Sequence, residues 1–183
     1  MRFHFLFPSL FLACSGGEQE PPTKQTPKKT TPTQIAKPKT IDSDHPGAKV
    51  YTEVCQACHM LSGKGLGKSY PPLVGSEWLN KSDDILIRIL LHGLEGKITV
   101  AGKEYGSMSM ANNNLNDTQI ADVISFIRSY YGKIEKPVSE AQVKAVRGLY
   151  PDGHPAWRLE TLKPFESGAL SSEGQKSVDP DKA

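Results

Sequence analysis

The sequence contains no apolar run near the roughly 18 residues that a membrane-spanning helix requires. It also has no dominant charge of one sign, since 22 Lys and Arg residues accompany 20 Asp and Glu residues. The positive excess lies before residue 45, because residues 45–132 and 133–183 each carry eight charges of each sign. No basic surface for nucleic acid is therefore expected. With 37% apolar and 23% charged residues and no internal repeat, the 183 residues fit one soluble domain with extensions.

Cysteine is scarce, and each of the three cysteines needs its own explanation because an odd number cannot all pair as disulfides. Cys14 follows one basic residue and a short apolar stretch, which indicates a signal peptide over residues 1–13. A small residue before Cys14 and Ser15 after it resemble a bacterial lipoprotein cleavage site, which implies that Cys14 is lipidated and is the mature N-terminus. Phe11 departs from that pattern, in which leucine is usual, so an ordinary signal peptide with an incidental Cys14 stays open. Acyl chains on Cys14 would anchor the protein to a membrane surface.

The composition divides the remaining chain into four segments. Residues 14–44 are rich in Pro, Thr and Lys with almost no large apolar residue, which is typical of a flexible tether. Residues 45–132 have the apolar periodicity of a folded domain. We expect residues 133–165 to form an extension with a short helix, and residues 166–183 to be a disordered tail.

Periodicity and capping signals predict four helices in residues 44–149. The first has Asp44 as its cap and Pro46 in its first turn, and it runs into a pair of cysteines. The second spans about residues 83–91 behind the cap Ser82 and is too apolar for the surface. The last two open with reciprocal capping boxes and span about residues 116–131 and 139–149.

Cys55, Cys58 and His59 form the pattern Cys-x-x-Cys-His, which is the attachment signature of haem c. Within one helical turn the two thiols reach one edge of the macrocycle, and the histidine reaches the iron. A thioredoxin-like pair would follow a buried strand, whereas a helix precedes these cysteines. A zinc site would need further ligands, and the other four histidines form no cluster at ligand spacing. We therefore predict one covalent haem c whose iron is bound by His59.

The other axial ligand of the iron decides the function. Met108 and Met110 lie in a loop of small residues before the third helix, and we predict that one of them binds the iron. A lone methionine is more often core filler, but two of the four methionines in one loop after a haem site favour ligation. Met60 is too close to His59 to reach the other face of the haem. The second ring nitrogen of His59 is expected to donate to a backbone carbonyl of residues 70–72.

The order of these elements resembles a class I cytochrome c over about residues 45–132. The resemblance implies an all-α fold with about three main helices around a covalent haem, and here an extra C-terminal helix. Four stretches are similar to a bacterial subgroup associated with periplasmic dehydrogenases, namely residues 70–78, 91–96, 100–105 and 115–123. The ligand methionine of that subgroup is usually followed by proline. Aligning that pair with Met108 and Ser109 favours Met108, with Met110 as the alternative, although the serine departs from the pattern.

A core of about 88 residues is marginal, and a haem would supply missing apolar volume. The extension through Val143 and Arg147 resembles a tail of the same subgroup, and we expect it to pack on the domain. His92 is interpreted as a cap or packing residue rather than an iron ligand. The candidates for haem or core contact are Pro72, Leu73, Val74, Trp78, Ile85, Leu86, Ile89, Leu90, Ile124 and Ile127.

The predicted function is single-electron transfer by an exported protein on the periplasmic side of a bacterial membrane. The donor would be a dehydrogenase or quinol-oxidising complex and the acceptor another redox protein, with no small-molecule substrate and no catalytic residue. One alternative is a haem peroxidase or gas-binding protein with an open sixth position. Another alternative is a membrane-tethered haem subunit of a larger redox complex.

Overall fold

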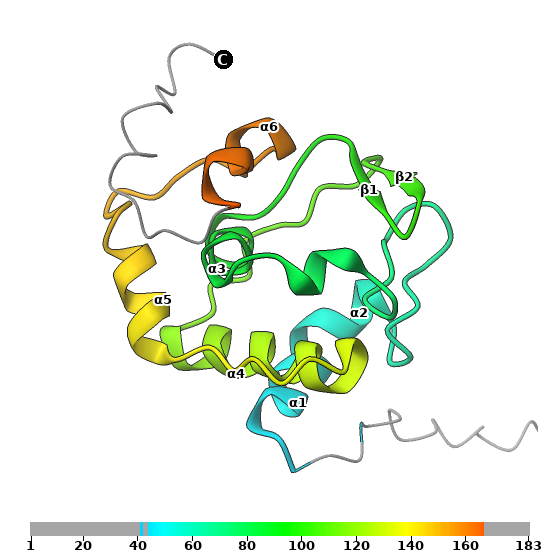
Figure 1. Cartoon of the computed structure of the whole chain (residues 1–183), viewed down its shortest axis with the longest axis horizontal. Coiled ribbons are helices and arrows are strands. Elements are labelled where there is room, and N and C mark those ends of the chain that lie inside the picture. Colours follow the sequence, from blue (N-terminus) through cyan, green and yellow to red (C-terminus); the bar gives the residue numbers. More distant parts are fainter. Residues whose placement is uncertain (1–40, 42–43, 167–183) are drawn as a thin grey trace, which may run out of the picture. The chain divides into compact units, whose positions relative to one another are not determined.

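The computed structural model describes residue 41 and residues 44–166, which fold mainly as helices (Figure 1). The segments predicted as signal peptide and tail, together with Cys14, lie outside the described residues. The all-α prediction is confirmed apart from one antiparallel pair of short strands, β1 and β2. No helix in this part of the chain is long and apolar enough to cross a membrane. The elements in chain order are α1 (Pro46–Val50), the π-helical turn η1 (Tyr51–Cys55), α2 (Gln56–His59), the 3₁₀ turn η2 (Glu77–Asn80), α3 (Asp83–His92), β1 (Ile98–Val100), β2 (Lys103–Tyr105), α4 (Asp117–Ile127), the π-helical turn η3 (Arg128–Gly132), α5 (Glu140–Arg147), α6 (Leu159–Leu162) and the 3₁₀ turn η4 (Lys163–Phe165).

The elements α1, η1 and α2 form one continuous helical stretch. Its cap is His45, whose Nδ1 accepts a hydrogen bond from the backbone N–H of Gly47 at 3.1 Å. The prediction of Asp44 as the cap is therefore wrong, because the helix begins at Pro46 and Asp44 lies one residue too early. Gly47 lets α1 cross α4 closely, since a Cβ at this position would overlap the carbonyl of Asp122.

Helix α3 confirms the predicted buried helix. The Ser82 hydroxyl accepts from the backbone N–H of Ile85 at the start, and Gly93, at φ 89°, ends the helix. Every residue from Asp84 to Leu91 is buried, including the ion pair between Asp84 and Arg88 at 2.8 Å. A helix that is apolar on most of its circumference needs cover on all sides, and the remaining elements of the fold provide it.

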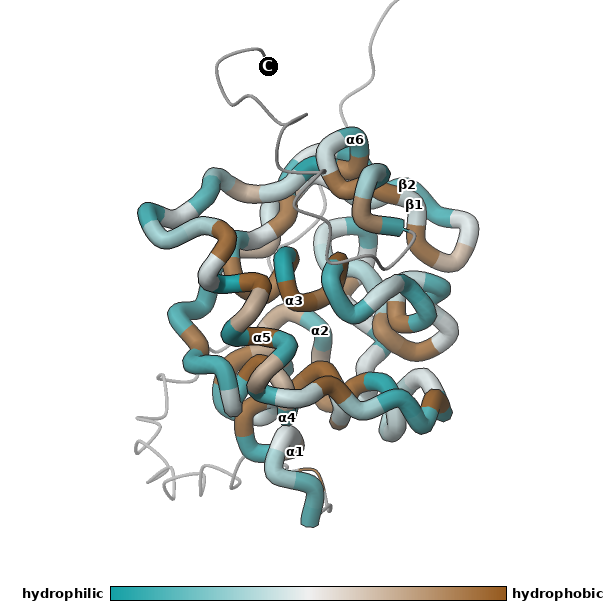
Figure 2. Tube along the Cα trace, turned by 60° about the vertical axis from the view of Figure 1, so that its left-hand side comes forward, coloured by the Kyte–Doolittle hydropathy of each residue, from teal (hydrophilic) through white to brown (hydrophobic). Residues whose placement is uncertain are grey.

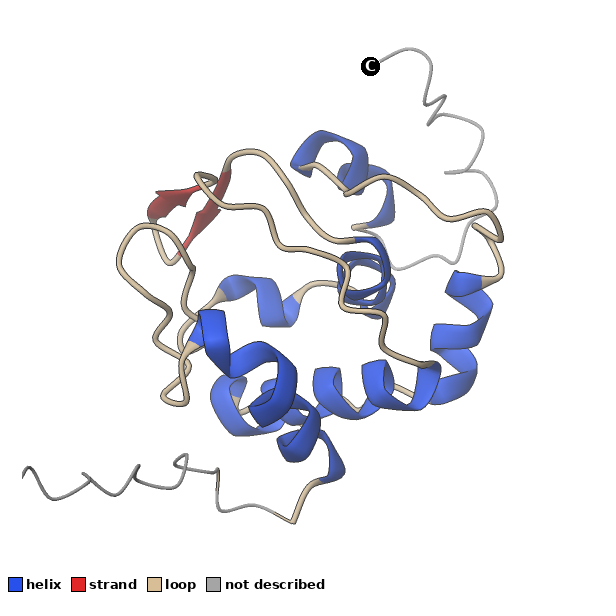
Figure 3. Ribbon diagram, turned by 180° about the vertical axis from the view of Figure 1, so that it is seen from behind, coloured by secondary structure: helices blue, strands red, loops and turns tan. Residues whose placement is uncertain are grey.

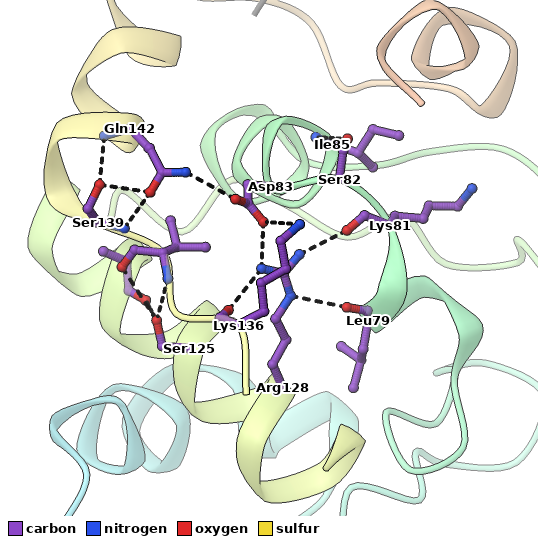
Figure 4. Close-up of polar contacts among 12 residues, drawn as sticks. Leu79, Lys81, Ser82, Asp83, Ile85, Ser125, Arg128, Lys136, Ser139 and Gln142 are labelled. Carbon is purple, nitrogen blue, oxygen red and sulfur yellow. Dashed lines mark hydrogen bonds and ion pairs between the residues drawn. The ribbon is translucent and has the colours of Figure 1, made fainter. Parts of the chain in front are cut away.

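The turn η3, which continues α4, contributes a second fully buried arginine, Arg128 (Figure 4). Its guanidinium bonds the carboxylate of Asp83 at 2.7 Å and the carbonyls of Leu79 and Lys81 at 3.1 and 2.9 Å. Partial burial by itself would raise the pKa of Asp83, but the bonds and charges of Arg128 and Lys136 outweigh it and lower that pKa. This network joins the end of α4 to the start of α3, and Gln142 of α5 joins it through Asp83.

Two hydrophobic clusters share α3. Hydrophobic and hydrophilic residues alternate along α4 and α5 (Figure 2), as expected for helices with one buried face. The first cluster lies among α1, α3, α4 and α5. The second joins Trp78 and the other face of α3 to the β1–β2 hairpin and to the C-terminal residues. The hairpin lies on the side of the fold opposite α5 (Figure 3).

The extension packs on the domain, as predicted. Val143 and Val146 of α5 are fully buried against α4, and Arg147 bonds Asp117 at 2.6 Å. The helices α6 and η4 and the strands of the hairpin have only three or four residues each, which is too short to produce a periodic pattern in the sequence, so none of them was predicted. Leu162 and Phe165, in these short C-terminal helices, belong to the second cluster.

One predicted core residue is misplaced. Val74 is 43% exposed, although its neighbour Leu73 packs against the first cluster. Both backbone N–H groups donate to the Gly63 carbonyl, at 2.7 Å from Leu73 and 3.0 Å from Val74. The chain turns tightly there, so only one of two adjacent apolar side chains faces inward.

Candidate functional site

Cys55, Cys58 and His59 lie on one face of the first helical stretch, because residues three and four apart on a helix are neighbours. All three line a cavity of about 210 Å³. Neither cysteine forms a disulfide, and both are partly buried. Burial, and then the neighbouring Cys58, raise the pKa of Cys55 to about 12, so this thiol is protonated at neutral pH.

The ring of His59 is fixed by the predicted kind of partner. Its Nδ1 lies 3.0 Å from the carbonyl oxygen of Pro71, which can only accept, so Nδ1 carries the proton. Burial lowers the pKa of His59, although the bond to Pro71 acts in the opposite direction. A neutral imidazole with an unprotonated Nε2 is the form that binds a metal ion.

The turn after His59 is tied to the helices by two tyrosines. Tyr51 donates its hydroxyl to the carbonyl of Met60 at 2.7 Å, and Tyr131 donates to the carbonyl of Leu61 at 2.9 Å. Burial raises the pKa of both phenols, so they remain donors. The peptide segment beyond His59 therefore has a defined path toward Pro71.

Met108 and Met110, from a distant part of the sequence, line the same cavity as His59. Met108 is 52% exposed, whereas Met110 is partly buried and packs against both hydrophobic clusters. The backbone of Met110 pairs with Leu94 through two hydrogen bonds of 2.8 and 2.9 Å. The fold thus brings both predicted methionines to the site.

A second hollow of about 100 Å³ continues the first, since Cys55, His59, Leu94 and Met110 line both. The predicted contact residues Pro72, Leu73, Trp78, Leu86, Ile89, Leu90 and Ile127 line this part. Ile85 and Ile124 are buried in the clusters but do not line it.

Part of the apolar wall comes from residues that were not predicted from the sequence. Leu94, Ile98 and Val100 line the second hollow, and Tyr105 lines the first. The alternation of Ile98 and Val100 around Thr99 was a weak strand signal that could have indicated two inward residues. Trp78 is held on this wall, because its indole N–H donates to the carbonyl of Thr99 at 2.8 Å.

These residues fit a covalently bound iron porphyrin. Two thiols lie on one wall of a mostly apolar hollow, beside one imidazole whose remaining nitrogen is free to bind iron. They do not fit a zinc site, because residues 41 and 44–166 hold no group of three or more His, Cys, Asp and Glu side chains that could bind a metal ion. His92 packs against Tyr150 and Trp157, which agrees with its interpretation as a packing residue.

Comparison with known proteins agrees with this chemistry. The family model described as cytochrome c matches residues 45–130. A protein named cytochrome c-552, from Thermus thermophilus, is 36% identical over 110 residues, which cover 55% of this chain and 83% of that protein. The cytochrome c subunit of a quinone alcohol dehydrogenase from Gluconacetobacter polyoxogenes is 31% identical over 106 residues, or 22% of its length. The cytochrome c subunit of a gluconate 2-dehydrogenase from Pantoea cypripedii is 32% identical over 111 residues, or 23% of its length.

Proposed function

Because the chain belongs to the cytochrome c family, an electron-transfer family with covalent haem c, we propose that His59 and Met108 bind the iron of its haem. Cys55 and Cys58 would form the two thioether links. Met110 is the alternative ligand. The observation that carries this proposal is the single cavity lined by both cysteines, by His59 and by both methionines.

Haem c supplies a one-electron couple between ferrous and ferric iron. The residues of this chain prepare the site for that couple. The Pro71 carbonyl orients His59, and a methionine sulfur would be the other ligand that holds the iron and would raise its reduction potential. Apolar walls from Leu73, Trp78 and Ile98 would keep water away from a bound haem. Closed ligation favours electron transfer over binding of peroxide or gases.

The proposed partners are a dehydrogenase or quinol-oxidising complex as donor and another redox protein as acceptor. Support comes from two relatives whose names describe cytochrome c subunits of dehydrogenases. This chain spans less than a quarter of those subunits, so either a diffusing carrier or a tethered subunit of such a complex is compatible with the similarity. We place the protein on the periplasmic side of a bacterial membrane, anchored through a lipid on Cys14 and the 14–44 tether, with 45–132 as the haem domain.

The ligand proposal is tested by optical spectra of the oxidised protein carrying Met108→Ala or Met110→Ala. Loss of the sulfur-to-iron band in Met108→Ala alone is the expected result. Loss in Met110→Ala alone would transfer the role to Met110. Met60→Ala is the matched control and should retain the band, since Met60 does not line the cavity. A high-spin wild-type spectrum with rapid carbon monoxide binding would refute the closed ligation.

The anchor and the partner need separate measurements. The mass of the mature N-terminal peptide should show acylation at Cys14, and an unmodified terminus would reject the anchor. Mild detergent extraction of membranes should then separate the two partner proposals. Co-purification with a dehydrogenase supports a tethered subunit, whereas release as a single chain supports a carrier.

A further inference from the structure

Leu94 lies between the C-terminal extension and the methionine loop, which is defined here as residues 106–115. On one side its backbone N–H and carbonyl both pair with Met110, at 2.9 and 2.8 Å. On the other side Trp157 donates its backbone N–H to the carbonyl of Gly93 at 3.0 Å and accepts from the N–H of Glu95 at 2.8 Å. Trp157, Leu94 and Met110 therefore lie side by side like three paired strands.

Trp157 is held firmly in place at one edge of these three paired segments, because its side chain is fully buried. The indole stacks on His154 at 3.9 Å between ring centroids and meets the edge of Phe165 at 5.6 Å. The guanidinium of Arg88 lies 5.3 Å from the indole centroid, and the carboxylate of Asp84 fixes it at 2.8 Å. The extension is thus locked to α3 at this tryptophan.

The methionine loop has few other attachments. Among the described residues from Ser107 to Asn114, Met110 alone has backbone hydrogen bonds to the backbone outside the loop. Ser107, Met108 and Ser109 are all exposed. Leu94 and Met110 also line both parts of the cavity. A shift of the Leu94 backbone would therefore move Met110, and with it the methionine loop that contains both candidate ligands.

We propose that Trp157 is a positioning residue for the sixth iron ligand, acting through Leu94 and Met110. The buried indole fixes the backbone of residues 93–95, and that backbone holds the methionine loop against the cavity. This inference rests on the proposed methionine ligation. It assigns to the extension a role in haem ligation in addition to its packing on α3 and α4.

The test compares Trp157→Ala with Leu162→Ala in the full-length protein with haem bound. Leu162 is an equally buried residue of the same cluster, but it has no backbone bond to residues 93–95. Imidazole binding to the oxidised iron measures how often the methionine leaves. Trp157→Ala should raise the apparent imidazole affinity about tenfold. This is the change expected when the state in which the methionine has left the iron becomes about ten times more populated. Leu162→Ala should leave it within about twofold of the wild type.

Hydrogen exchange gives a readout that does not depend on the haem spectrum. The amide of Met110 should exchange about tenfold faster in Trp157→Ala and at the wild-type rate in Leu162→Ala. Trp157→Phe should restore both properties, because it keeps a buried ring and the indole N–H has no partner among the described residues. Equal effects of Trp157→Ala and Leu162→Ala, or no effect of the former, would overturn the inference. A wild-type protein without a sulfur-to-iron band would instead refute the methionine ligation itself, and the exchange result would still report on the loop.

Discussion

The cavity is bordered by two segments that are held in different ways. The histidine segment, residues 51–75, begins as a helix and is tied down by the hydroxyls of Tyr51 and Tyr131 and by the bond from His59 to Pro71. The methionine segment, residues 93–115, is mostly loop, and Met108 in it is half exposed. Its middle depends on backbone pairing with Leu94.

The difference shows that the positions of the two proposed iron ligands are fixed by different kinds of contact. The helix places His59 relative to the two cysteines without help from distant residues. The methionine loop is mostly exposed and is held by few backbone hydrogen bonds, and such segments are the first to open locally. The histidine segment should therefore tolerate perturbation of the extension, whereas the methionine segment should not.

The largest effect is expected from removing the two proposed thioether links to haem in the histidine segment. Cys55→Ser with Cys58→Ser leaves no thiol in the described residues to form a thioether, so haem should be lost completely under denaturing conditions. Mass spectrometry of the denatured chain should find the mass of the protein without haem. Each single variant should keep one link, and full retention of haem by the double variant would contradict the assignment.

A smaller effect is expected from Gly93→Ala in the methionine segment. Gly93 has φ 89°, and a Cβ there would overlap the carbonyl of Met110. We expect a loss of about 2 kcal/mol in the free energy of unfolding, from backbone strain and displaced contacts, together with a weaker sulfur-to-iron band.

The matched control for Gly93→Ala is Gly75→Ala in the histidine segment. Gly75 has a similar φ of 72°, and nothing lies within 4 Å of its Cβ position. It should lose about 1 kcal/mol with an unchanged band, because it suffers strain without a clash. Denaturant titration and optical spectra measure both variants. An equally weakened band in the control would remove the distinction between the two segments.

The smallest effect concerns pH and His92, the last residue of α3, which lies directly before the methionine segment. Burial, then the nearby charges of His154, Arg88 and Arg147, lower the pKa of His92 from 6.5 to about 4. The unfolded chain therefore binds a proton between these values that the folded chain does not, so stability falls as the pH drops from 6.5 to 4.

His92→Phe keeps a ring against Tyr150 and Trp157 and removes this titration. The fall in melting temperature between pH 6.5 and 4 should be shallower than in the wild type. Parallel curves for the two proteins would show that His92 does not contribute. The sulfur-to-iron band at pH 7 should be unchanged, because His92 is already neutral there.

Features that depend on neighbouring residues were predictable from the sequence. The caps Ser82, Asn116 and Ser139 are confirmed, because a cap bonds a backbone group two or three residues away. The Asp44 cap was wrong by one residue, since an exposed Asp and a His are both able to accept the bond. Val74 was wrong because apolar character alone does not say which of two adjacent side chains faces inward.

The sequence by itself determined the proposed haem-attachment face, because Cys55, Cys58 and His59 are separated by less than two turns of one helix. It also determined that a methionine loop follows, but not how that loop is held. Only the tertiary structure placed Leu94 between Trp157 and Met110, residues that are 63 and 16 positions away from it. Such pairing depends on how α3, the hairpin and the extension pack together, and no local pattern of residue types encodes that arrangement.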